Sequence, residues 1–445
     1  MKLRFIGFGL LLSTLFFSCF EEMGTTKPPN IVAKPPPIVS EKKLPQPICK
    51  ESTNQLTQLT KPIVVMVSID GFRADYIQKF QPKTLLSIIE KGIYTKALIP
   101  SYPTLTFPNH YTLVTGRYPG NHGIVSNIFY DTVLEQTYNA FDSSAEIYLW
   151  YKGDPIWNVA EKQGMIAHTY DWVGSAANVN RIGPTCYTKY DGSIEFEDKI
   201  NSVITSLSLP EDKRPHFIAL YTADIDNDGH KYGPDSKEVK TAVEKIDTNL
   251  SILWNFIQNS KLPINLIVVS DHGMQSTDIN KIIYLQDIIG PEAMRSFKMS
   301  DRGGASMLYI KDPVGLASAF QKLKETEKNY KVYLKSDAPV EFHMTHPTRT
   351  GDIIIVPDIP YYVKDFRPLP GVKESLKSGN HGWSYENPEM HALFVAAGYN
   401  IEKNELVPEF KNIDVYPFLL NLLDIKTDTA FDGDPETLKK YIKNK

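Results

Sequence analysis

The sequence predicts an α/β fold in which a mostly parallel central sheet is flanked by helices on both faces. Apolar stretches of strand length alternate with longer stretches of helical periodicity, which is the pattern of βα units around a parallel sheet. The strand candidates are rich in β-branched residues and apolar on both faces, as buried parallel strands are. Several of them end in a carboxylate, at the edge where open α/β sheets place their sites.

The first strand is predicted at residues 62–69, whose sequence PIVVMVSI has no polar face. Stretches of the same character predict strands at 216–221, 265–270 and 392–396, with a shorter candidate at 353–356. Helical spacing predicts helices at 83–91, 154–164, 195–206 and 237–259. Residues 275–365 carry the weakest pattern, and we expect a small α+β insertion there, beside the site.

The N-terminal residues predict export. Residues 1–18 have the basic start and short apolar core of a signal peptide, too short to span a membrane. Cys19 follows a small residue, as in a bacterial lipoprotein cleavage site, so we expect a lipid anchor at Cys19 on the periplasmic side or cell surface. Plain secretion and an uncleaved anchor are the alternatives. The proline-rich residues 19–60 predict an extended tether, and 61–445 the catalytic domain.

Charge and cysteine content narrow the partners and the compartment. The net charge of −4 offers no basic face for a nucleic-acid polymer, but it leaves a small anionic substrate open. With Cys19 lipidated, Cys49 and Cys186 remain, and in an oxidising compartment they either form a bridge or stay as free thiols. The sequence carries no indication of the oligomeric state.

Carboxylates follow three of the predicted strands: the first runs into Asp70, the second is followed by Asp226, and the third runs into Asp271. A single aspartate in this place is often a turn former or a helix cap. Three of them meet at one edge of a parallel sheet, which predicts a site there.

Histidines accompany these carboxylates. His230 stands four residues after Asp226, His272 adjoins Asp271, and His381 lies in a third loop with a neighbouring glycine. Three aspartates and three histidines form an oxygen and nitrogen ligand set that suits Zn²⁺, and with a hydroxyl they suffice for two sites. Other histidines near the motifs are interpreted as packing or hydrogen-bonding residues, namely His110, His122, His343, His346 and His391.

Thr106 is the candidate nucleophile. Pro103 and Pro108 bracket it in a loop rich in hydroxyl groups, which indicates rigid presentation at the start of a helix. The alternative is a plain helix-capping threonine.

Taken in order, these motifs resemble the nucleotide pyrophosphatase/phosphodiesterase family of the alkaline phosphatase superfamily. The matching text is Asp-Gly at 70–71, Thr-Phe-Pro-Asn-His-Tyr at 106–111, Asp-x-x-x-His at 226–230, Asp-His-Gly-Met at 271–274 and His-Gly at 381–382.

The resemblance implies roles for the residues at these positions. One zinc is expected on Asp226, His230 and His381. A second is expected on Asp70, Asp271 and His272, and it also contacts the Thr106 hydroxyl. Asn127 matches the residue that holds a non-bridging phosphate oxygen. The implied cycle begins with attack by Thr106 on phosphorus, and hydrolysis of the resulting covalent diester follows.

For nucleotide-directed relatives, the resemblance implies that the base stacks between Phe107 and a downstream tyrosine. Tyr190 fits that role, with Tyr187 as the fallback, and Tyr221 is expected to line the same pocket. The predicted reaction is therefore hydrolysis of nucleotide phosphodiester or phosphoanhydride bonds to nucleoside 5′-monophosphates.

Three other functions remain open. A choline or lipid head-group phosphodiesterase needs an aromatic cage with acids, for which the sequence offers Trp150, Tyr151, Trp157 and Trp172. A phosphomonoesterase or phosphonate hydrolase would share the metals. A non-enzymatic surface lipoprotein is the third, although such a protein has no need of six ligands and a nucleophile.

Overall fold

The computed structural model describes residues 43–443 apart from residue 311. Contacts divide the chain into two units, residues 1–42 and residues 43–445, and all the described residues belong to the second. The predicted signal peptide and Cys19 lie outside the described residues. The folded unit begins before residue 61, because a short strand at Ile48–Cys49 and a turn of helix at Leu56–Gln58 belong to it.

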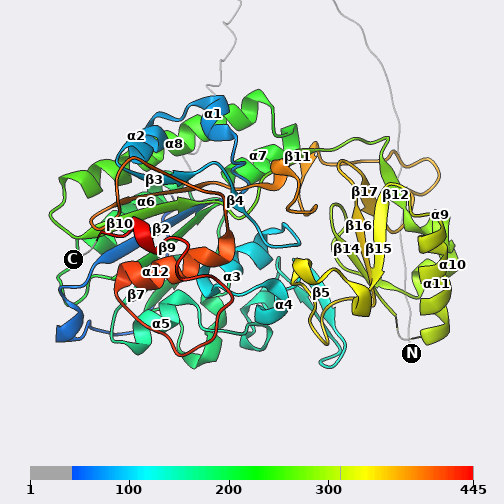
Figure 1. Ribbon diagram of the computed structural model, residues 1–445, viewed down its shortest axis with the longest axis horizontal. Coiled ribbons are helices and arrows are strands. Elements are labelled where there is room, and N and C mark those ends of the chain that lie inside the picture. The colour runs from blue at the N-terminus through cyan, green and yellow to red at the C-terminus, as the bar shows by residue number, and fades with distance from the viewer. Residues whose placement is uncertain (1–42, 311, 444–445) are drawn as a thin grey trace, which may run out of the picture. The chain divides into compact units, whose positions relative to one another are not determined.

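A nine-stranded sheet forms the centre of this unit (Figure 1). In spatial order its strands are β1 (Ile48–Cys49), β8 (Cys186–Thr188), β7 (Ala167–Tyr170), β9 (Phe217–Thr222), β2 (Ile63–Ile69), β10 (Ile264–Val269), β19 (Phe394–Gly398), β3 (Gly92–Thr95) and β20 (Glu405–Val407). Neighbours from β8 to β10 are parallel, as are β3 and β20. The predicted α/β fold with a mostly parallel sheet is therefore confirmed.

One strand runs against the prediction. Residues 392–396 were expected to form a parallel strand, but β19 is antiparallel to both β10 and β3. The reason is the path of the chain, which leaves the sheet at the carboxyl end of β10 and re-enters it from the same edge. The strand predicted at 353–356 forms as β16 (Ile353–Pro357), outside the central sheet.

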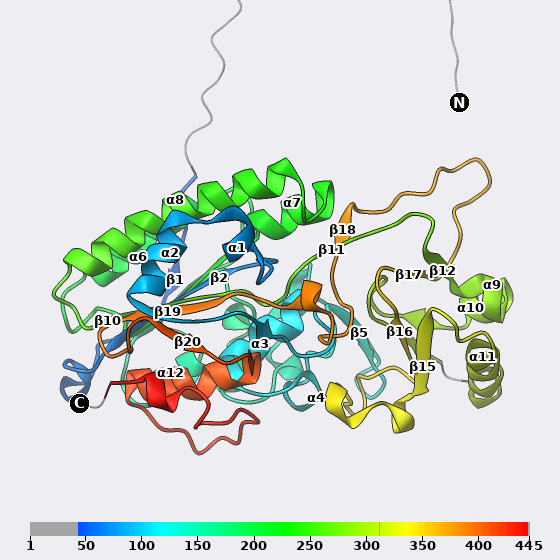
Figure 2. The same ribbon diagram turned by 45° about the horizontal axis from the view of Figure 1, so that its top comes forward.

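Helices cover both faces of the central sheet (Figures 1 and 2). One layer contains α1 (Tyr76–Phe80), α2 (Lys83–Glu90), α6 (Phe196–Leu207), α7 (Asp224–Tyr232) and α8 (Lys237–Asn259). The other contains α3 (Thr106–Thr115), α4 (Pro119–His122), α5 (Ile156–Lys162) and α12 (Val415–Leu423). Because side chains alternate along a strand, Val64 and Met66 of β2 enter one core and Val65 and Val67 the other.

The stretch from 275 to 365 forms a smaller α+β unit with a core of its own. Its antiparallel sheet has the order β13 (Lys298–Met299), β14 (Ser306–Tyr309), β16 and β15 (Tyr330–Leu334), with α9 (Leu285–Ile289), α10 (Pro291–Arg295) and α11 (Pro313–Glu325) beside it (Figure 2). Two further pairings lie near the ends of this stretch. β12 (Ile282–Tyr284) pairs with β17 (Tyr362–Lys364) within it, and β11 (Gln275–Ser276) pairs with β18 (Gly379–Asn380), which follows it in the chain. Three further short pairings involve β4 (Leu98–Ile99) with β21 (Phe410–Lys411) and β5 (Ile128–Asp131) with β6 (Gln136–Asn139), and β4 also bridges to Ala392.

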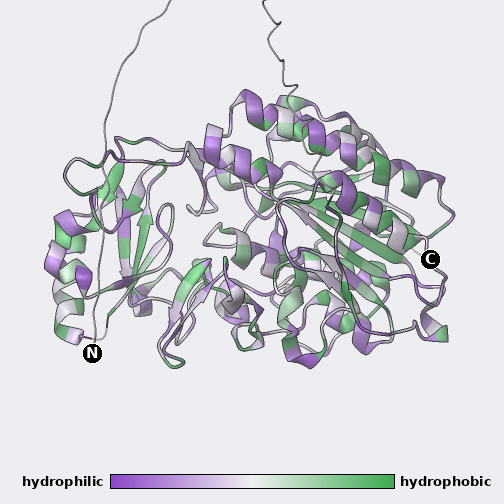
Figure 3. Ribbon diagram, turned by 180° about the vertical axis from the view of Figure 1, so that it is seen from behind, coloured by the Kyte–Doolittle hydropathy of each residue, from purple (hydrophilic) through white to green (hydrophobic). Residues whose placement is uncertain are grey.

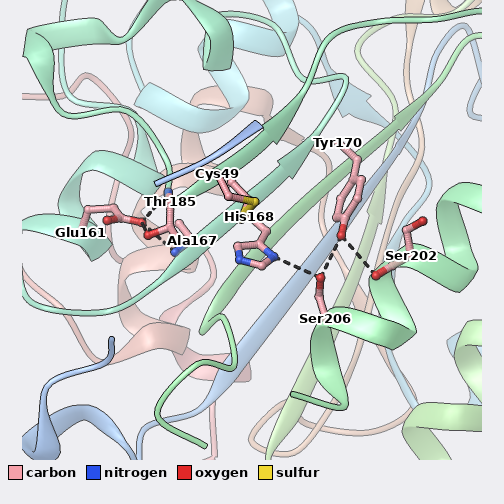
Figure 4. Close-up of a disulfide and its surroundings, with 9 residues drawn as sticks. Cys49, Glu161, Ala167, His168, Tyr170, Thr185, Ser202 and Ser206 are labelled. Atoms are coloured by element: carbon pink, nitrogen blue, oxygen red, sulfur yellow. Dashed lines mark hydrogen bonds between the residues drawn. A yellow bond between two sulfur atoms is a disulfide. The ribbon is translucent and has the colours of Figure 1, made fainter. Parts of the chain in front are cut away.

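A disulfide between Cys49 and Cys186 joins β1 to β8 at the edge of the central sheet (Figure 4). It decides between the two states that the sequence left open for these cysteines. Beside it, the buried ring of His168 accepts or donates a 3.0 Å hydrogen bond with the Ser206 hydroxyl. Hydrophobic residues concentrate along the central strands (Figure 3). Among the described residues, no helix has both the length and the apolar character needed to cross a membrane.

Candidate active site

The carboxyl edge of β2, β9 and β10 gathers the six predicted ligand residues. Asp70 follows β2, Asp226 lies on α7 directly after β9, and Asp271 follows β10. His272 Nε2 lies 3.0 Å from Asp271 Oδ2 and 3.5 Å from Asp70 Oδ1. The second half of the cluster centres on Asp226, whose carboxylate lies 3.4 Å from His230 Nε2 and 3.6 Å from His381 Nε2. The imidazoles of His272 and His381 stack at 3.6 Å and join the two halves.

Local backbone features bring these residues within reach. Asp226 and His230 share one face of α7 because residues four apart on a helix are neighbours. Gly71 turns the chain after β2 with a φ of +67°, a conformation that costs a residue with a Cβ atom. A Cβ at this position would lie 3.0 Å from both Cα and Cβ of Asp226. Glycine therefore allows the end of β2 to approach α7.

The three histidines all turn the same ring nitrogen toward the cluster. Each Nδ1 faces a backbone carbonyl, which only accepts, so Nδ1 carries the proton and Nε2 holds a lone pair. The pairs are His230 with Gly379 at 2.8 Å, His272 with Gly273 at 2.9 Å and His381 with Thr104 at 2.9 Å. This arrangement is typical of metal-binding histidines, whose second nitrogen is oriented by a carbonyl or carboxylate.

The carboxylates supply the complementary half of a cation site. Asp70 Oδ1, Asp226 Oδ1 and Asp271 Oδ2 are buried and accept no hydrogen bond from the described residues. Burial, and then the nearby carboxylates of Asp271 and Asp226, raise the pKa of Asp70 well above its usual range. Burial, and then the neighbouring His272 and His230, hold the pKa of His381 well below its usual range, so the ring is neutral. Unsatisfied carboxylate oxygens beside imidazole nitrogens fit divalent cations.

Two tight triads within the described residues have the geometry to hold a metal ion. One comprises Asp226, His272 and His381, and the other Asp70, His110 and Asp271, each with ligand atoms within 4.8 Å of one another. The described residues thus contain two buried metal-binding groups. The sequence interpretation placed His110 outside the ligand set, whereas one of these triads includes it, with Nδ1 3.2 Å from Asp271 Oδ2. The His110 ring also makes hydrogen bonds. Its Nδ1 donates to the Thr106 carbonyl at 2.9 Å, and its Nε2 lies 2.8 Å from the Ser68 hydroxyl.

Thr106 is the first residue of α3 and lies beside the cluster. Its Oγ1 is 3.2 Å from His272 Nε2. Leu105 occupies the N-cap position of α3, where no side-chain capping hydrogen bond forms within the described residues. The Thr106 hydroxyl therefore does not cap the helix. The partial positive charge of a helix N-terminus favours an anion at this point.

Asn127 lies next to Thr106 with its amide in a fixed orientation. Its Oδ1 accepts a hydrogen bond of 2.9 Å from the Phe107 backbone N–H. The Nδ2 group is therefore the part of the amide that can donate to a ligand.

A cavity of about 590 Å³ opens beside this cluster. Asp70, Thr106 and Asp226 line one end of it. Phe107, Tyr190 and Tyr221, which the sequence interpretation placed in the base pocket, line it as well, whereas the fallback residue Tyr187 is not part of its lining. Tyr221 also donates a 2.6 Å hydrogen bond to Asp70 Oδ2, which ties the aromatic wall to the cluster.

Sequence reasoning missed a part of this wall. Phe141 lines the cavity, is 72% exposed and lies edge-on to Phe107 at 6.3 Å. The two residues are 34 positions apart in the sequence, and no sequence pattern indicated this contact. Tyr151 and Trp172 also line the cavity, whereas Trp150 and Trp157 are only 1% and 0% exposed and lie outside its lining.

Acidic residues of the cavity wall away from the ligand cluster are compensated by neighbours. Glu146 pairs with Lys189 at 2.6 Å, and Asp171 pairs with Lys199 at 2.7 Å. Asp142 accepts hydrogen bonds from the Ser144 N–H and the Asn139 amide, both at 2.8 Å. This end of the cavity is thus aromatic with little uncompensated charge.

Comparisons with known proteins identify the family of this chain. The family model described as type I phosphodiesterase / nucleotide pyrophosphatase matches residues 64–384. The human ectonucleotide pyrophosphatase/phosphodiesterase family member 1 is 34% identical over 86% of the chain, which spans only 42% of that protein. An uncharacterized pyrophosphatase/phosphodiesterase of Schizosaccharomyces pombe is 31% identical over 85% of the chain and 80% of its own length.

The fold is also similar to solved structures of ectonucleotide pyrophosphatase/phosphodiesterases. Murine ectonucleotide pyrophosphatase/phosphodiesterase 5, as an inactive threonine-to-alanine variant in complex with AMP, superposes with a TM-score of 0.80 at 27% identity. The match covers 86% of this chain and 100% of that one. On the family model and these relatives, the chain belongs to the type I phosphodiesterase/nucleotide pyrophosphatase family.

Proposed function

We propose that the chain is a two-zinc phosphodiesterase/pyrophosphatase that hydrolyses nucleotides to nucleoside 5′-monophosphates through a covalent intermediate on Thr106. The observation that carries the proposal is the place of the Thr106 hydroxyl. It lies at a helix N-terminus, 3.2 Å from His272, and lines a cavity whose other end is aromatic. A nucleophile, a cation site and a base pocket are thus contiguous.

The proposed ligands of one zinc are Asp226, His230 and His381, and those of the other are Asp70, Asp271 and His272, with Thr106. Bound there, two zinc ions would lower the pKa of the threonine hydroxyl and offset the charge of the phosphate and the leaving oxygen. The orphaned carboxylate oxygens and the lone pairs on Nε2 support this set. His272 lies between the two halves, so its contact with Asp226 and His381 is compatible with either partition.

The chain's own residues then account for the steps. Thr106 Oγ attacks phosphorus, the bond from phosphorus to the leaving group breaks, and a phosphothreonine diester forms. The proton of the Thr106 hydroxyl leaves with the leaving group in the first step. In the second step water attacks the same phosphorus and the bond from phosphorus to Thr106 Oγ breaks. The water oxygen stays on the nucleoside monophosphate, and a proton from the water restores the Thr106 hydroxyl. Asn127 Nδ2 donates to a non-bridging oxygen throughout, since its Oδ1 is held by the Phe107 N–H. Two in-line displacements give net retention at phosphorus.

A nucleobase suits the distal end of the cavity better than a choline head group does. A quaternary ammonium needs acids that are free to compensate its charge, and the carboxylates of Glu146 and Asp171 are already paired with lysines. Trp150 and Trp157, which the sequence offered for a cage, are buried elsewhere. A neutral base stacked between Phe107 and Tyr190 needs neither free acids nor these tryptophans. The related murine structure in complex with AMP also supports a nucleotide substrate.

We also propose that the protein acts outside the cytoplasm. The disulfide between Cys49 and Cys186 supports an oxidising compartment, in which such bonds persist. Lipid attachment at Cys19, which would place the enzyme at the membrane surface of the cell envelope, is part of this proposal.

The test compares three substrates on the full-length enzyme: a nucleoside 5′-aryl phosphodiester, an aryl phosphomonoester and an arylphosphocholine. We expect preference for the first, loss of activity on chelation and its recovery with zinc. Thr106→Ala should lose turnover but keep its zinc in elemental analysis, whereas Thr106→Ser, which retains a hydroxyl, should keep part of the activity. Near-wild-type turnover in Thr106→Ala, or preference for the arylphosphocholine, would overturn the proposal.

A further inference from the structure

Asp301 of the insertion reaches into the loop that carries Asn127. It lies between β13 and β14, and its Oδ2 accepts hydrogen bonds from the Ser126 hydroxyl at 2.5 Å and from the Ile128 N–H at 3.0 Å. These donors belong to the residues on either side of Asn127. One carboxylate oxygen therefore holds the side chain of the residue before Asn127 and the backbone of the residue after it.

Asp301 is itself held on the insertion side. Its backbone carbonyl accepts a 3.0 Å hydrogen bond from the hydroxyl of Ser306, the first residue of β14. The adjacent Arg302 turns away and pairs with Asp365, with Nε 2.9 Å from Oδ1. The Asp301 side chain is thus directed at the loop of Asn127, and the contact runs from the connection between β13 and β14 to that loop.

The side chain of Asn127 is held by α3. The Phe107 N–H donates to Asn127 Oδ1 at 2.9 Å, so α3 fixes the plane of the amide, while Asp301 holds the residues on both sides of Asn127. Catalytic donors need placement within about half an ångström to act on a transition state. Loss of either anchor should therefore weaken the hydrogen bond from Nδ2 to phosphate.

We propose that Asp301 is a positioning residue for Asn127, so that the insertion at 275–365 completes the phosphate-binding part of the site. This rests on the proposed function, because it requires that Asn127 contacts the phosphate. It predicts that Asp301 acts on turnover only through Asn127. The insertion then has a part in the chemistry beyond shaping the rim of the cavity.

The test is a double-mutant cycle on the full chain, with kcat and KM measured on bis(4-nitrophenyl) phosphate, which has no base to bind. Removal of one donor to a developing charge costs about 10²-fold in kcat or more, and we expect that loss for Asn127→Ala. Asp301→Leu, which keeps the side-chain size but has no acceptor, should lower kcat about tenfold or more with bound zinc unchanged. In the Asn127→Ala background the same change should cost less than about twofold.

A conservative variant that keeps the acceptor oxygen distinguishes a loss of positioning from a general loss of stability. Both hydrogen bonds end on the single atom Oδ2, so Asp301→Asn can present its amide oxygen in the same place and should keep kcat within about threefold of the wild type. Arg302→Leu is the matched control, since it changes the neighbouring residue and leaves the contact with Ser126 and Ile128 intact. If Asp301→Leu does not fold, Ser126→Ala removes one of the two bonds and should show the same dependence on Asn127.

An equal loss from Asp301→Leu in both backgrounds, or no loss in either, would overturn the inference. No effect of Asn127→Ala would overturn it as well. Thr106→Ala separates these results from a failure of the proposed function, since an active Thr106→Ala variant would refute the mechanism itself whatever Asp301 does.

Discussion

The ion pair of Lys199 and Asp171 lies behind the aromatic wall of the cavity, and the change Lys199→Met tests what it contributes. Lys199 Nζ lies 2.7 Å from Asp171 Oδ2, and the two side chains are only 5% and 3% exposed. Asp171 follows β7 and lines the cavity, and the lysine also lies 5.6 Å from the centre of the Tyr190 ring. The pair thus connects the core of the sheet to the predicted base slot.

The size of the effect follows from what Asp171 keeps when the lysine is gone. Removing one partner of a buried ion pair costs about 3–5 kcal/mol, because the other charge stays buried. The Thr188 hydroxyl still donates to Asp171 Oδ1 at 2.5 Å, so the lower end, about 3 kcal/mol, is expected. Lys199→Met/Asp171→Asn removes both charges, and we expect it to recover most of that loss.

Substrate binding should change along with stability. Loss of the cation beneath Tyr190 and an uncompensated carboxylate in the cavity wall weaken base stacking, which is worth about 1–3 kcal/mol per base. We expect KM for a nucleoside 5′-aryl phosphodiester to rise about tenfold, which corresponds to 1.4 kcal/mol. On bis(4-nitrophenyl) phosphate, which has no base, kcat and KM should stay close to those of the wild type.

Urea unfolding of the single and double variants measures the first effect, and the two substrates measure the second. Lys240→Met is the matched control, because that lysine is on an exposed face of α8 and forms a surface ion pair with Glu244, four residues later in the same helix. Unfolding free energies of Lys199→Met and Lys240→Met that agree within 1 kcal/mol would refute the reasoning on stability. Equal losses on both substrates would refute the role of the pair in base binding.

Three further changes test other parts of the structure. Tyr221→Phe removes the 2.6 Å hydrogen bond to Asp70 and should weaken zinc binding about 10- to 100-fold, measured by competition with a chelator. Gly71→Ala places a Cβ 3.0 Å from Asp226 at a φ of +67°, and we expect kcat to fall about 10²-fold, with unchanged kcat contradicting the steric argument. Burial lowers the pKa of His168 to about 4, below about 6.5 in the unfolded chain, so the unfolded state takes up the proton first. Stability should therefore fall from pH 6.5 toward pH 4, by about 2 kcal/mol at pH 4.5, and His168→Gln should flatten that slope in pH-dependent urea unfolding.

The central sheet and the cluster at its edge could be predicted because the relevant signals are local. β2, β9 and β10 are short apolar segments, and the carboxylates that follow them belong to the same few residues of sequence. Asp226 and His230 are only four residues apart in the sequence, and α7, a helix that the sequence analysis did not predict, places them one turn apart. Candidate ligand residues that directly follow a strand can therefore be predicted from the sequence without knowledge of long-range contacts.

The rest depends on contacts between distant segments. Asp171 contacts Lys199 of α6 across 28 residues, and Phe141 contacts Phe107 of α3 across 34, so each contact joins a helix to a distant segment. The sequence also could not distinguish the tryptophans offered for a cage, because the tertiary packing decides that Trp172 lines the cavity and Trp157 is fully buried.

The antiparallel direction of β19 and the contact of Asp301 have one topological cause. The chain leaves the sheet after Asp271 and His272, builds the insertion, and returns through His381 at the same edge. A strand that enters from the carboxyl edge of its neighbours must run antiparallel to them. A unit whose two ends are both attached at the ligand cluster is also confined beside it, so a side chain between its strands can reach the loop of Asn127. The placement of the insertion between two groups of ligands thus explains why residues far from the cluster in the sequence take part in arranging it.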